Sequence, residues 1–381
     1  MFNLRRWFML DPDVVYLNHG SFGATPRPVF REYQRWQREL ETQPVAFFSR
    51  RYNDLMSRAR AVLGNFLGTA ADNVVYVTNV TMAVNIVARS LLLGPGDEVL
   101  ASDHEYGACD RVWRFMQGKL GFKYINQPIR VPVTSPEAVI EDLWRGVTPR
   151  TRLIFVSHIT SPTALILPVT QICRQARQAG ILTMLDGAHA PGQVPVEVET
   201  IGADYYGANL HKWLCAPKGA GFLYARPEVQ GLLDPLVVSW GYESDQPGPS
   251  RFIDYHEFWG TRDPAAFLSV PAAIDFQEKH DWDRVRLACH ELASVALKRI
   301  SDMSGQIPLQ PDDPGWYAQM VSMKLPGHVD LERCKRILYE KYRIEVPLME
   351  WNGSTLIRIS IQGYNSRRDV DALVGALEKI L

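Results

Sequence analysis

An acid and a lysine follow two short apolar segments near the middle of the chain. The run ILTMLD ends on Asp186, and the run ADYYGAN is soon followed by Lys212, which stands between His211 and Trp213. Short apolar runs of this kind are typical of buried parallel strands, and ligands bind at the carboxyl edge of a parallel sheet. We therefore expect the carboxylate and the amine to lie at one site.

This pair of side chains suits one organic cofactor, pyridoxal phosphate. The cofactor needs an amine that forms a Schiff base with its aldehyde, and an anion that keeps its pyridine nitrogen protonated. Lys212 and Asp186 are the candidates for these two tasks. Each residue alone has an ordinary interpretation as well, because most acids at strand ends cap a helix and most lysines are solvated.

Longer motifs around these residues resemble those of a known enzyme family. The segments DGAH, GANLHKW and KGAGFLY are similar to the fold-type I pyridoxal-phosphate enzymes of the class V aminotransferase family. YLNHGSFGATP, NVTMAVN, DHEYGACDRVW and SHITSPTALILPV most resemble a subgroup of amino-acid epimerases within it. The resemblance implies an α/β fold, with a mostly parallel sheet in a large domain and a smaller C-terminal α/β domain.

The expected domain organisation has three parts. Residues 1–14 form an N-terminal arm, residues 15–260 form the cofactor-binding large domain, and residues 261–381 form the small domain. Strand and helix patterns alternate through the large domain, which indicates a sheet covered on both faces. In the small domain the periodicity predicts helices near residues 264–279 and 290–301, and the alternation in LIRISI predicts a strand that carries Arg358.

The resemblance also implies how the phosphate and the ring are held. Asn79, Val80 and Thr81 match the family's phosphate-binding turn, at the start of a predicted helix whose free N–H groups suit an anion. An ordinary Asn or Thr cap is the alternative there. Tyr106 matches the residue whose ring stacks on the cofactor, and a partly buried core tyrosine is its alternative.

Other expected cofactor contacts come from residues near the lysine and from a second subunit. His189 matches the residue beside the phenolic oxygen of the cofactor, and Asn209 and His211 flank the site on the approach to Lys212. Thr261 matches a residue that reaches the phosphate of the neighbouring subunit. The resemblance therefore implies a homodimer with a shared active site.

Three residues are expected to face the substrate. Arg358 matches the arginine that grips the substrate carboxylate, a bidentate task suited to a guanidinium group. His19 and Ser21 lie on an N-terminal loop that resembles the family's substrate-facing loop. Ser161 stands near a position where relatives commonly have Asn, and it is left out of the expected site.

The shared chemistry of the family begins at Cα of an amino acid, with the freed Lys212 as general base. An epimerase needs a second proton donor on the opposite face, for which Tyr106 and His19 are the candidates. A class V aminotransferase, a C–S lyase and a non-catalytic cofactor-binding protein remain alternatives. A persulfide-forming cysteine desulfurase is disfavoured, because EVPLMEWNGSTLIRIS has no Cys before the carboxylate-binding arginine.

Composition narrows the possible partners. The formal net charge of -1 gives no excess of basic residues for binding nucleic acid or an anionic membrane. The five cysteines form no CxxC pair, so we expect reduced core thiols in a cytoplasmic protein. The histidines have no zinc-ligand spacing, and no metal is expected.

Overall fold

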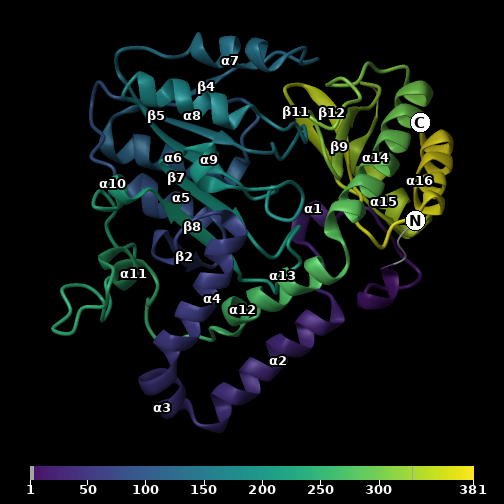
Figure 1. Cartoon of the computed structure of the whole chain (residues 1–381). Helices are drawn as coiled ribbons and strands as arrows, with labels where there is room; N and C mark the ends of the chain where they lie inside the picture. The colour runs from purple at the N-terminus through teal and green to yellow at the C-terminus, as the bar shows by residue number, and fades with distance from the viewer. Residues whose placement is uncertain (1–3, 328) are drawn as a thin grey trace.

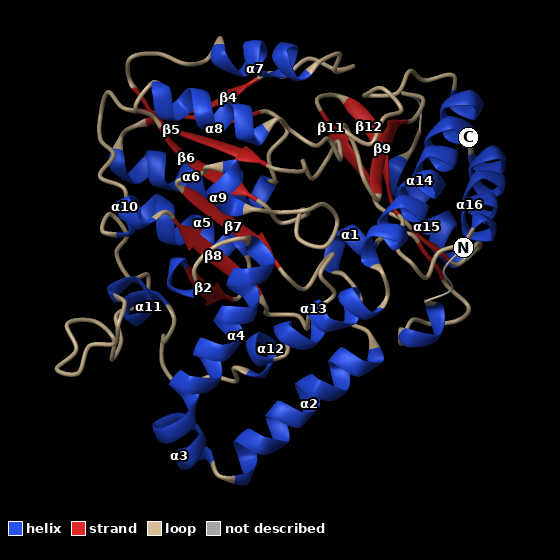
Figure 2. Ribbon diagram, viewed as in Figure 1, coloured by secondary structure: helices blue, strands red, loops and turns tan. Residues whose placement is uncertain are grey.

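The computed structural model describes residues 4–327 and 329–381 of the chain. The described residues form three sheets, of seven, three and two strands, and the two larger sheets lie side by side (Figure 1). Helices surround both sheets (Figure 2). The expected α/β architecture is confirmed.

The large sheet is almost entirely parallel. Only β8 runs against its neighbours, and it pairs with β2 on one side and β7 on the other. The strands in spatial order are β2 (Val74–Val77), β8 (Gly221–Ala225), β7 (Tyr205–Asn209), β6 (Leu182–Asp186), β5 (Thr151–Ser157), β3 (Glu98–Ser102) and β4 (Lys123–Gln127).

Apolar side chains alternate between the two faces of this sheet, as they do in β5. Leu153 and Phe155 join one buried cluster with α5 and α6, whereas Ile154 and Val156 join the other cluster with α4 and α8. Both faces are therefore covered, which explains why the strands read as continuous apolar runs. The helices concerned are α4 (Tyr52–Leu67), α5 (Val80–Ser90), α6 (Gly107–Leu120) and α8 (Val169–Gln178).

The small sheet is antiparallel and carries Arg358. Its strand order is β11 (Leu348–Trp351), β12 (Ser354–Ser360) and β9 (Met320–Lys324). The helices packed around it are α14 (Trp282–Ser304), α15 (Leu331–Glu340) and α16 (Arg367–Ile380). A tight turn at Asn352 and Gly353 joins β11 to β12, and both residues have positive φ there, 45° and 71°.

Segments on either side of the expected boundaries pack across them. β1 (Val15–Tyr16) pairs with β10 (Ile344–Glu345) beside the small sheet, although it belongs to the expected large domain. Helices α12 (Ala265–Leu268) and α13 (Val270–Lys279) contact α2 (Arg27–Thr42) and α4. The division at residues 14/15 and 260/261 stays a prediction.

Short helices complete the described chain. They are η1 (Arg5–Trp7), α1 (His19–Phe22), α3 (Pro44–Ala46), η2 (Phe47–Arg51), η3 (Ala71–Asn73), α7 (Pro136–Trp144), α9 (Val198–Ile201), α10 (Pro227–Gln230) and α11 (Arg251–His256). None of the helices in the described residues is both long and apolar enough to cross a membrane. All five cysteines are buried and unpaired.

Candidate active site

The strands β3, β5, β6 and β7 run parallel and end at one edge of the large sheet. Asp186, the last residue of β6, is buried at this edge. Its Oδ1 accepts a hydrogen bond from the Ala188 N–H at 2.8 Å, and the Cys109 thiol donates to its Oδ2 at 3.5 Å. Burial raises the pKa of Asp186. These few contacts leave carboxylate lone pairs for a stronger donor in the site.

Lys212 lies in the turn between β7 and β8, where its amine meets an imidazole. Its Nζ is 3.2 Å from Nε2 of His189, and Nδ1 of the same ring accepts a hydrogen bond from Trp213 Nε1 at 3.1 Å. An indole N–H can only donate, so the proton of the neutral imidazole is on Nε2. The Nε2–H of His189 can therefore donate to the Lys212 amine when that amine is unprotonated.

The electrostatics of the site favour the neutral form of His189 and lower the pKa of Lys212. Burial lowers the pKa of His189 well below its usual value. Burial, and then the positive charge of Arg358, lower the pKa of Lys212 to about 8, while Asp186 acts in the opposite direction. An amine with this pKa is a much better nucleophile and base near neutral pH than an ordinary lysine.

The start of α5 lies beside the end of β7. Asn79 caps the helix, with its side-chain oxygen accepting from the Met82 N–H at 3.0 Å. Asn209 Oδ1 accepts from the Val80 N–H at 2.9 Å and so ties the helix start to the strand. Thr81, in the first turn, is partly exposed. The helix start can therefore receive an anion, and the ordinary capping role of Asn79 is present as well.

A glycine lets this helix start approach the sheet. A Cβ built at Gly221, the first residue of β8, would lie 2.9 Å from Cα of Asn79 and 2.7 Å from the carbonyl oxygen of Ala208. Both contacts are too short for any other residue, so β8 and the turn before α5 depend on glycine at this position.

Arg358 is a buried cation that contacts only neutral groups among the described residues. Its Nη1 donates to the carbonyl oxygen and the hydroxyl of Ser161, at 2.7 and 3.1 Å, and its Nη2 donates to Ser21 Oγ at 3.1 Å. Its Nε is buried and has no hydrogen-bond partner among the residues that the structure describes. Burial lowers the pKa of Arg358 to about 10. An uncompensated guanidinium group in this setting favours a carboxylate ligand.

Tyr106 and His19 occupy very different surroundings. Tyr106 precedes α6 and is 45% exposed. It lies close enough to Arg358 to act on the guanidinium group electrostatically. His19 is fully buried. Its Nδ1 contacts the Tyr364 hydroxyl at 2.9 Å, and its Nε2 contacts the carbonyl oxygen of Lys212 at 3.0 Å. His19 thus supports the backbone of the lysine turn, which differs from the expected position facing the substrate.

Two more of the expected residues lie outside the group around Lys212. His211 is partly buried, and its Nδ1 faces the carbonyl oxygen of Ala220 at 3.3 Å. Thr261 is exposed in the segment between α11 and α12. The structure thus leaves Thr261 accessible to another molecule, and its contact with a second subunit stays a prediction.

Three residues near the site were not expected from the sequence. Ser161 holds Arg358, the Cys109 thiol contacts Asp186, and Trp213 sets the tautomer of His189. The SHITSPTALILPV motif pointed to the segment that contains Ser161 but gave no reason to choose this serine. No group of three or more metal-ligating side chains is placed to hold a metal within the described ranges.

Comparisons with known proteins extend this description. The family model for aminotransferase class V matches residues 15–373. The chain is 38% identical to isopenicillin N epimerase of Amycolatopsis lactamdurans, over 99% of this chain and 98% of that one. It is 29% identical to a putative L-cysteine desulfhydrase of Oryza sativa subsp. japonica, over 97% of this chain and 85% of that one.

A solved structure shows the same fold. The enzyme C-DES, with glycine covalently linked to its pyridoxal-phosphate cofactor, superposes with a TM-score of 0.86 at 20% identity and covers 99% of both chains. The expected fold-type I architecture is confirmed. With a family match that extends from β1 into α16, the chain belongs to the class V aminotransferase family of pyridoxal-phosphate enzymes.

Proposed function

We propose that this enzyme epimerises an α-amino acid at Cα. The observation that carries the proposal is that the buried guanidinium group of Arg358, which has no acidic partner among the described residues, lies close enough to the Lys212 amine to lower its pKa. A carboxylate bound at Arg358 would present its Cα to groups that exchange protons. The 38% identity to isopenicillin N epimerase supports this choice of reaction.

The described residues fit the cofactor of the family. Lys212 offers an amine whose pKa is lowered to about 8, Asp186 a buried carboxylate, and the start of α5 a helix N-terminus that suits an anion. Once bound, pyridoxal phosphate would accept the electrons of the Cα–H bond. Asp186 would keep a proton at the ring nitrogen, and the Nε2–H of His189 would donate to the phenolic oxygen.

Proton transfer at Cα is then divided between the two faces of the bound cofactor. Lys212 takes the Cα proton on its own face, and the Tyr106 hydroxyl delivers one on the opposite face. The proximity of Tyr106 to Arg358 and its partial exposure support this role. His19 does not suit this role, because both of its ring nitrogens are engaged inside the protein. Ser21 and Ser161 orient Arg358 during the exchange.

Solvent deuterium tests the reaction type. With an accepted amino acid in D₂O, we expect deuterium at Cα of both enantiomers without loss of amine. Tyr106→Phe should still incorporate deuterium into the starting enantiomer through Lys212, while conversion to the other enantiomer falls by about 100-fold or more. Chiral chromatography with mass spectrometry measures both quantities. Stoichiometric keto acid with a pyridoxamine spectrum would instead identify an aminotransferase.

A C–S lyase is the second candidate function. The similarity to a putative L-cysteine desulfhydrase supports it, and β-elimination needs no active-site thiol. Pyruvate, ammonia and a sulfur product in the same assay would select the lyase over the epimerase. A persulfide-forming desulfurase stays disfavoured, because the segment from Glu345 to Ser360 contains no cysteine.

The pKa of Lys212 predicts a pH dependence for cofactor uptake. Only the unprotonated amine attacks the aldehyde, so we expect the rate of pyridoxal-phosphate uptake by the apoprotein to rise about tenfold per pH unit and to level off near pH 8. Arg358→Leu removes a positive charge that lowers this pKa, and the profile should therefore move to higher pH. Stopped-flow absorbance measures the rates.

The matched control is Lys298→Leu, which removes a positive charge from the exposed surface of α14. This variant should keep the original profile. An Arg358→Leu profile that coincides with that of the wild type would show that the guanidinium charge does not set the pKa of Lys212.

We further propose a homodimer in which Thr261 contacts the cofactor phosphate of the second subunit. The exposure of Thr261 supports the proposal. The segment before it is held internally, because Arg262 Nη2 donates to the carbonyl oxygen of Glu257 at 2.6 Å and the Glu257 carboxylate pairs with buried Arg60. A cytoplasmic location, expected from the cysteines, is likewise a proposal.

A further inference from the structure

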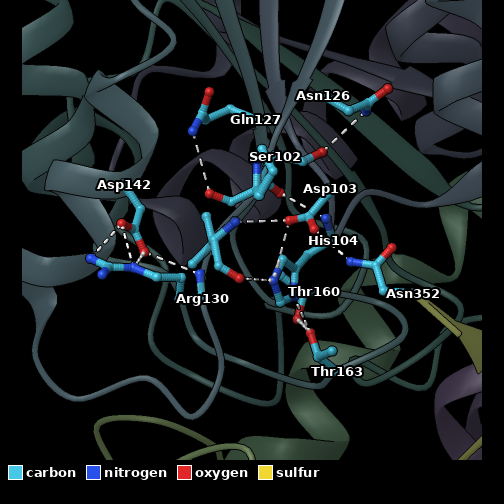
Figure 3. Close-up of polar contacts among 12 residues, drawn as sticks. Ser102, Asp103, His104, Asn126, Gln127, Arg130, Asp142, Thr160, Thr163 and Asn352 are labelled. Carbon is cyan, nitrogen blue, oxygen red and sulfur yellow. Dashed lines mark hydrogen bonds and ion pairs between the residues drawn. The ribbon is translucent and has the colours of Figure 1, made fainter. Parts of the chain in front are cut away.

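The turn of the β11–β12 hairpin rests on the loop that leads to Tyr106. Trp351 Nε1 donates to the carbonyl oxygen of Asp103 at 3.0 Å. Asn352 Nδ2 donates to the Asp103 carboxylate at 2.6 Å (Figure 3). The rings of Trp351 and His104 have their centroids 4.5 Å apart. Two residues of the small sheet's hairpin are thus fixed to two residues that follow β3.

His104 joins this contact to a second loop of the large sheet. Its buried ring faces the carbonyl oxygen of Ile129 with Nε2, at 3.1 Å, and the hydroxyl of Thr163 with Nδ1, at 2.7 Å (Figure 3). A carbonyl oxygen only accepts, so Nε2 carries the proton and Thr163 donates to Nδ1. Thr160 lies 2.7 Å from the Thr163 hydroxyl and continues the chain of hydrogen bonds.

The second loop returns to the small sheet at Arg358. Ser161, between these two threonines, accepts from Arg358 through its carbonyl oxygen and its hydroxyl. The carbonyl oxygen of Pro162 accepts from Ser322 on β9 at 2.7 Å. These contacts connect Arg358 to His104 through the second loop, and His104 to Trp351 at the end of β11. The hairpin then leads from Trp351 into β12, which carries Arg358.

These contacts hold β12 at two points, the hairpin turn and Arg358. Ser354 pairs with Trp351 at the hairpin turn, and Arg358 is four residues further along the strand. At about 3.4 Å per residue, the two anchors are about 14 Å apart. A rigid strand anchored at both points cannot pivot, so the hairpin turn constrains where the guanidinium group of Arg358 lies.

We propose that Trp351 and Asn352 are positioning residues, which hold the small sheet against the Asp103–His104 loop and thereby place Arg358 for the substrate carboxylate. The inference rests on the carboxylate-binding role of Arg358 in the proposed function. The hairpin also occupies the segment where a desulfurase would carry its cysteine. Here the same segment has a fixed contact with the large sheet.

The test compares two ligands of the holoenzyme. Asn352→Gly removes a hydrogen bond to the Asp103 carboxylate but suits the positive φ of this position, and Trp351→Phe keeps an aromatic ring but removes the N–H donor. We expect the dissociation constant of an accepted amino acid, measured by titrating the cofactor absorbance, to rise about tenfold and about fivefold respectively. The dissociation constant of a primary amine without a carboxylate should not change. Glu350→Ala, at an exposed position of the same hairpin, is the matched control.

Hydrogen exchange gives a second readout that does not depend on the cofactor. In the apoprotein, Trp351→Phe should speed exchange in residues 102–106 and 348–356 together, because each segment restrains the other. Equal weakening of both ligands, or unchanged binding and exchange, would overturn the proposal.

Arg358→Leu separates this inference from the proposed function. If this variant binds the amino acid as well as the wild type, the carboxylate role of Arg358 fails and the positioning role fails with it. A lyase or aminotransferase outcome in D₂O would leave these binding measurements unaffected, because they do not depend on the fate of Cα.

Discussion

Lys212→Ala is expected to abolish turnover and the covalent retention of pyridoxal phosphate. Lys212 provides the amine in contact with His189, and its pKa is lowered to about 8. Losing both the nucleophile and the Cα base should reduce the rate by at least about 10⁴-fold. Borohydride reduction followed by peptide mass spectrometry would locate the cofactor linkage.

Lys218 is the matched control for this prediction. It is the next lysine along the chain, but its Nζ donates to the carbonyl oxygen of Gly23 at 3.1 Å. Lys218→Ala should therefore retain the cofactor linkage at Lys212. A reduced linkage on Lys218 in the Lys212→Ala protein would contradict the assignment.

Mixing inactive variants extends the same prediction to the dimer. A hybrid of one Lys212→Ala subunit and one Thr261→Ala subunit has one site with both residues intact. Random exchange of subunits at equal amounts would restore about a quarter of the sites. Activity that stays at the level of the separate variants, or a fully active monomer in sedimentation, would exclude the shared site.

The strands and the residues at their ends could be predicted from sequence. The runs ILTMLD and NVVYV are apolar because both faces of the sheet are covered, and Asp186 ends its strand as expected. Helix boundaries were less accurate. The pattern predicted a helix over residues 290–301, whereas α14 begins at Trp282, because Trp282, Val285 and Cys289 continue its buried stripe.

The contacts within the site could not be predicted in the same way. The sequence motifs indicated Asp186, His189, Lys212 and Arg358, and the structure brings these four residues to one region. The sequence motifs did not indicate that His19 would be buried beside the turn that carries Lys212. That position depends on Tyr364, which lies far away in the chain and reaches His19 only through packing of the two sheets.

The hairpin turn illustrates the same limit. The turn at Asn352 and Gly353 was not predicted, although Asn and Gly adopt the positive φ that it requires more readily than other residues. Its role depends on Asp103 and His104, whose contacts arise from tertiary packing. The hairpin and its partner were therefore found only in the structure.

Asp186→Asn is expected to reduce turnover by at least about 100-fold while the cofactor remains bound. The carboxylate is buried, and its main protein contacts are the Ala188 N–H and the Cys109 thiol. An amide oxygen can still accept from Ala188, so the loop after β6 should keep its conformation. The neutral side chain no longer stabilises a proton on the cofactor nitrogen, and electron withdrawal from Cα weakens.

The measurement is kcat at full cofactor occupancy, with occupancy determined from absorbance and from the Lys212 linkage after reduction. Cys109→Ala is the control, because it removes the other side chain that contacts the carboxylate without changing the charge. That variant should keep kcat within about threefold, since a thiol is a weak hydrogen-bond donor. A kcat for Asp186→Asn within the same threefold range would show that catalysis does not depend on the charge of Asp186, and the anion at the ring nitrogen would have to come from elsewhere in the protein.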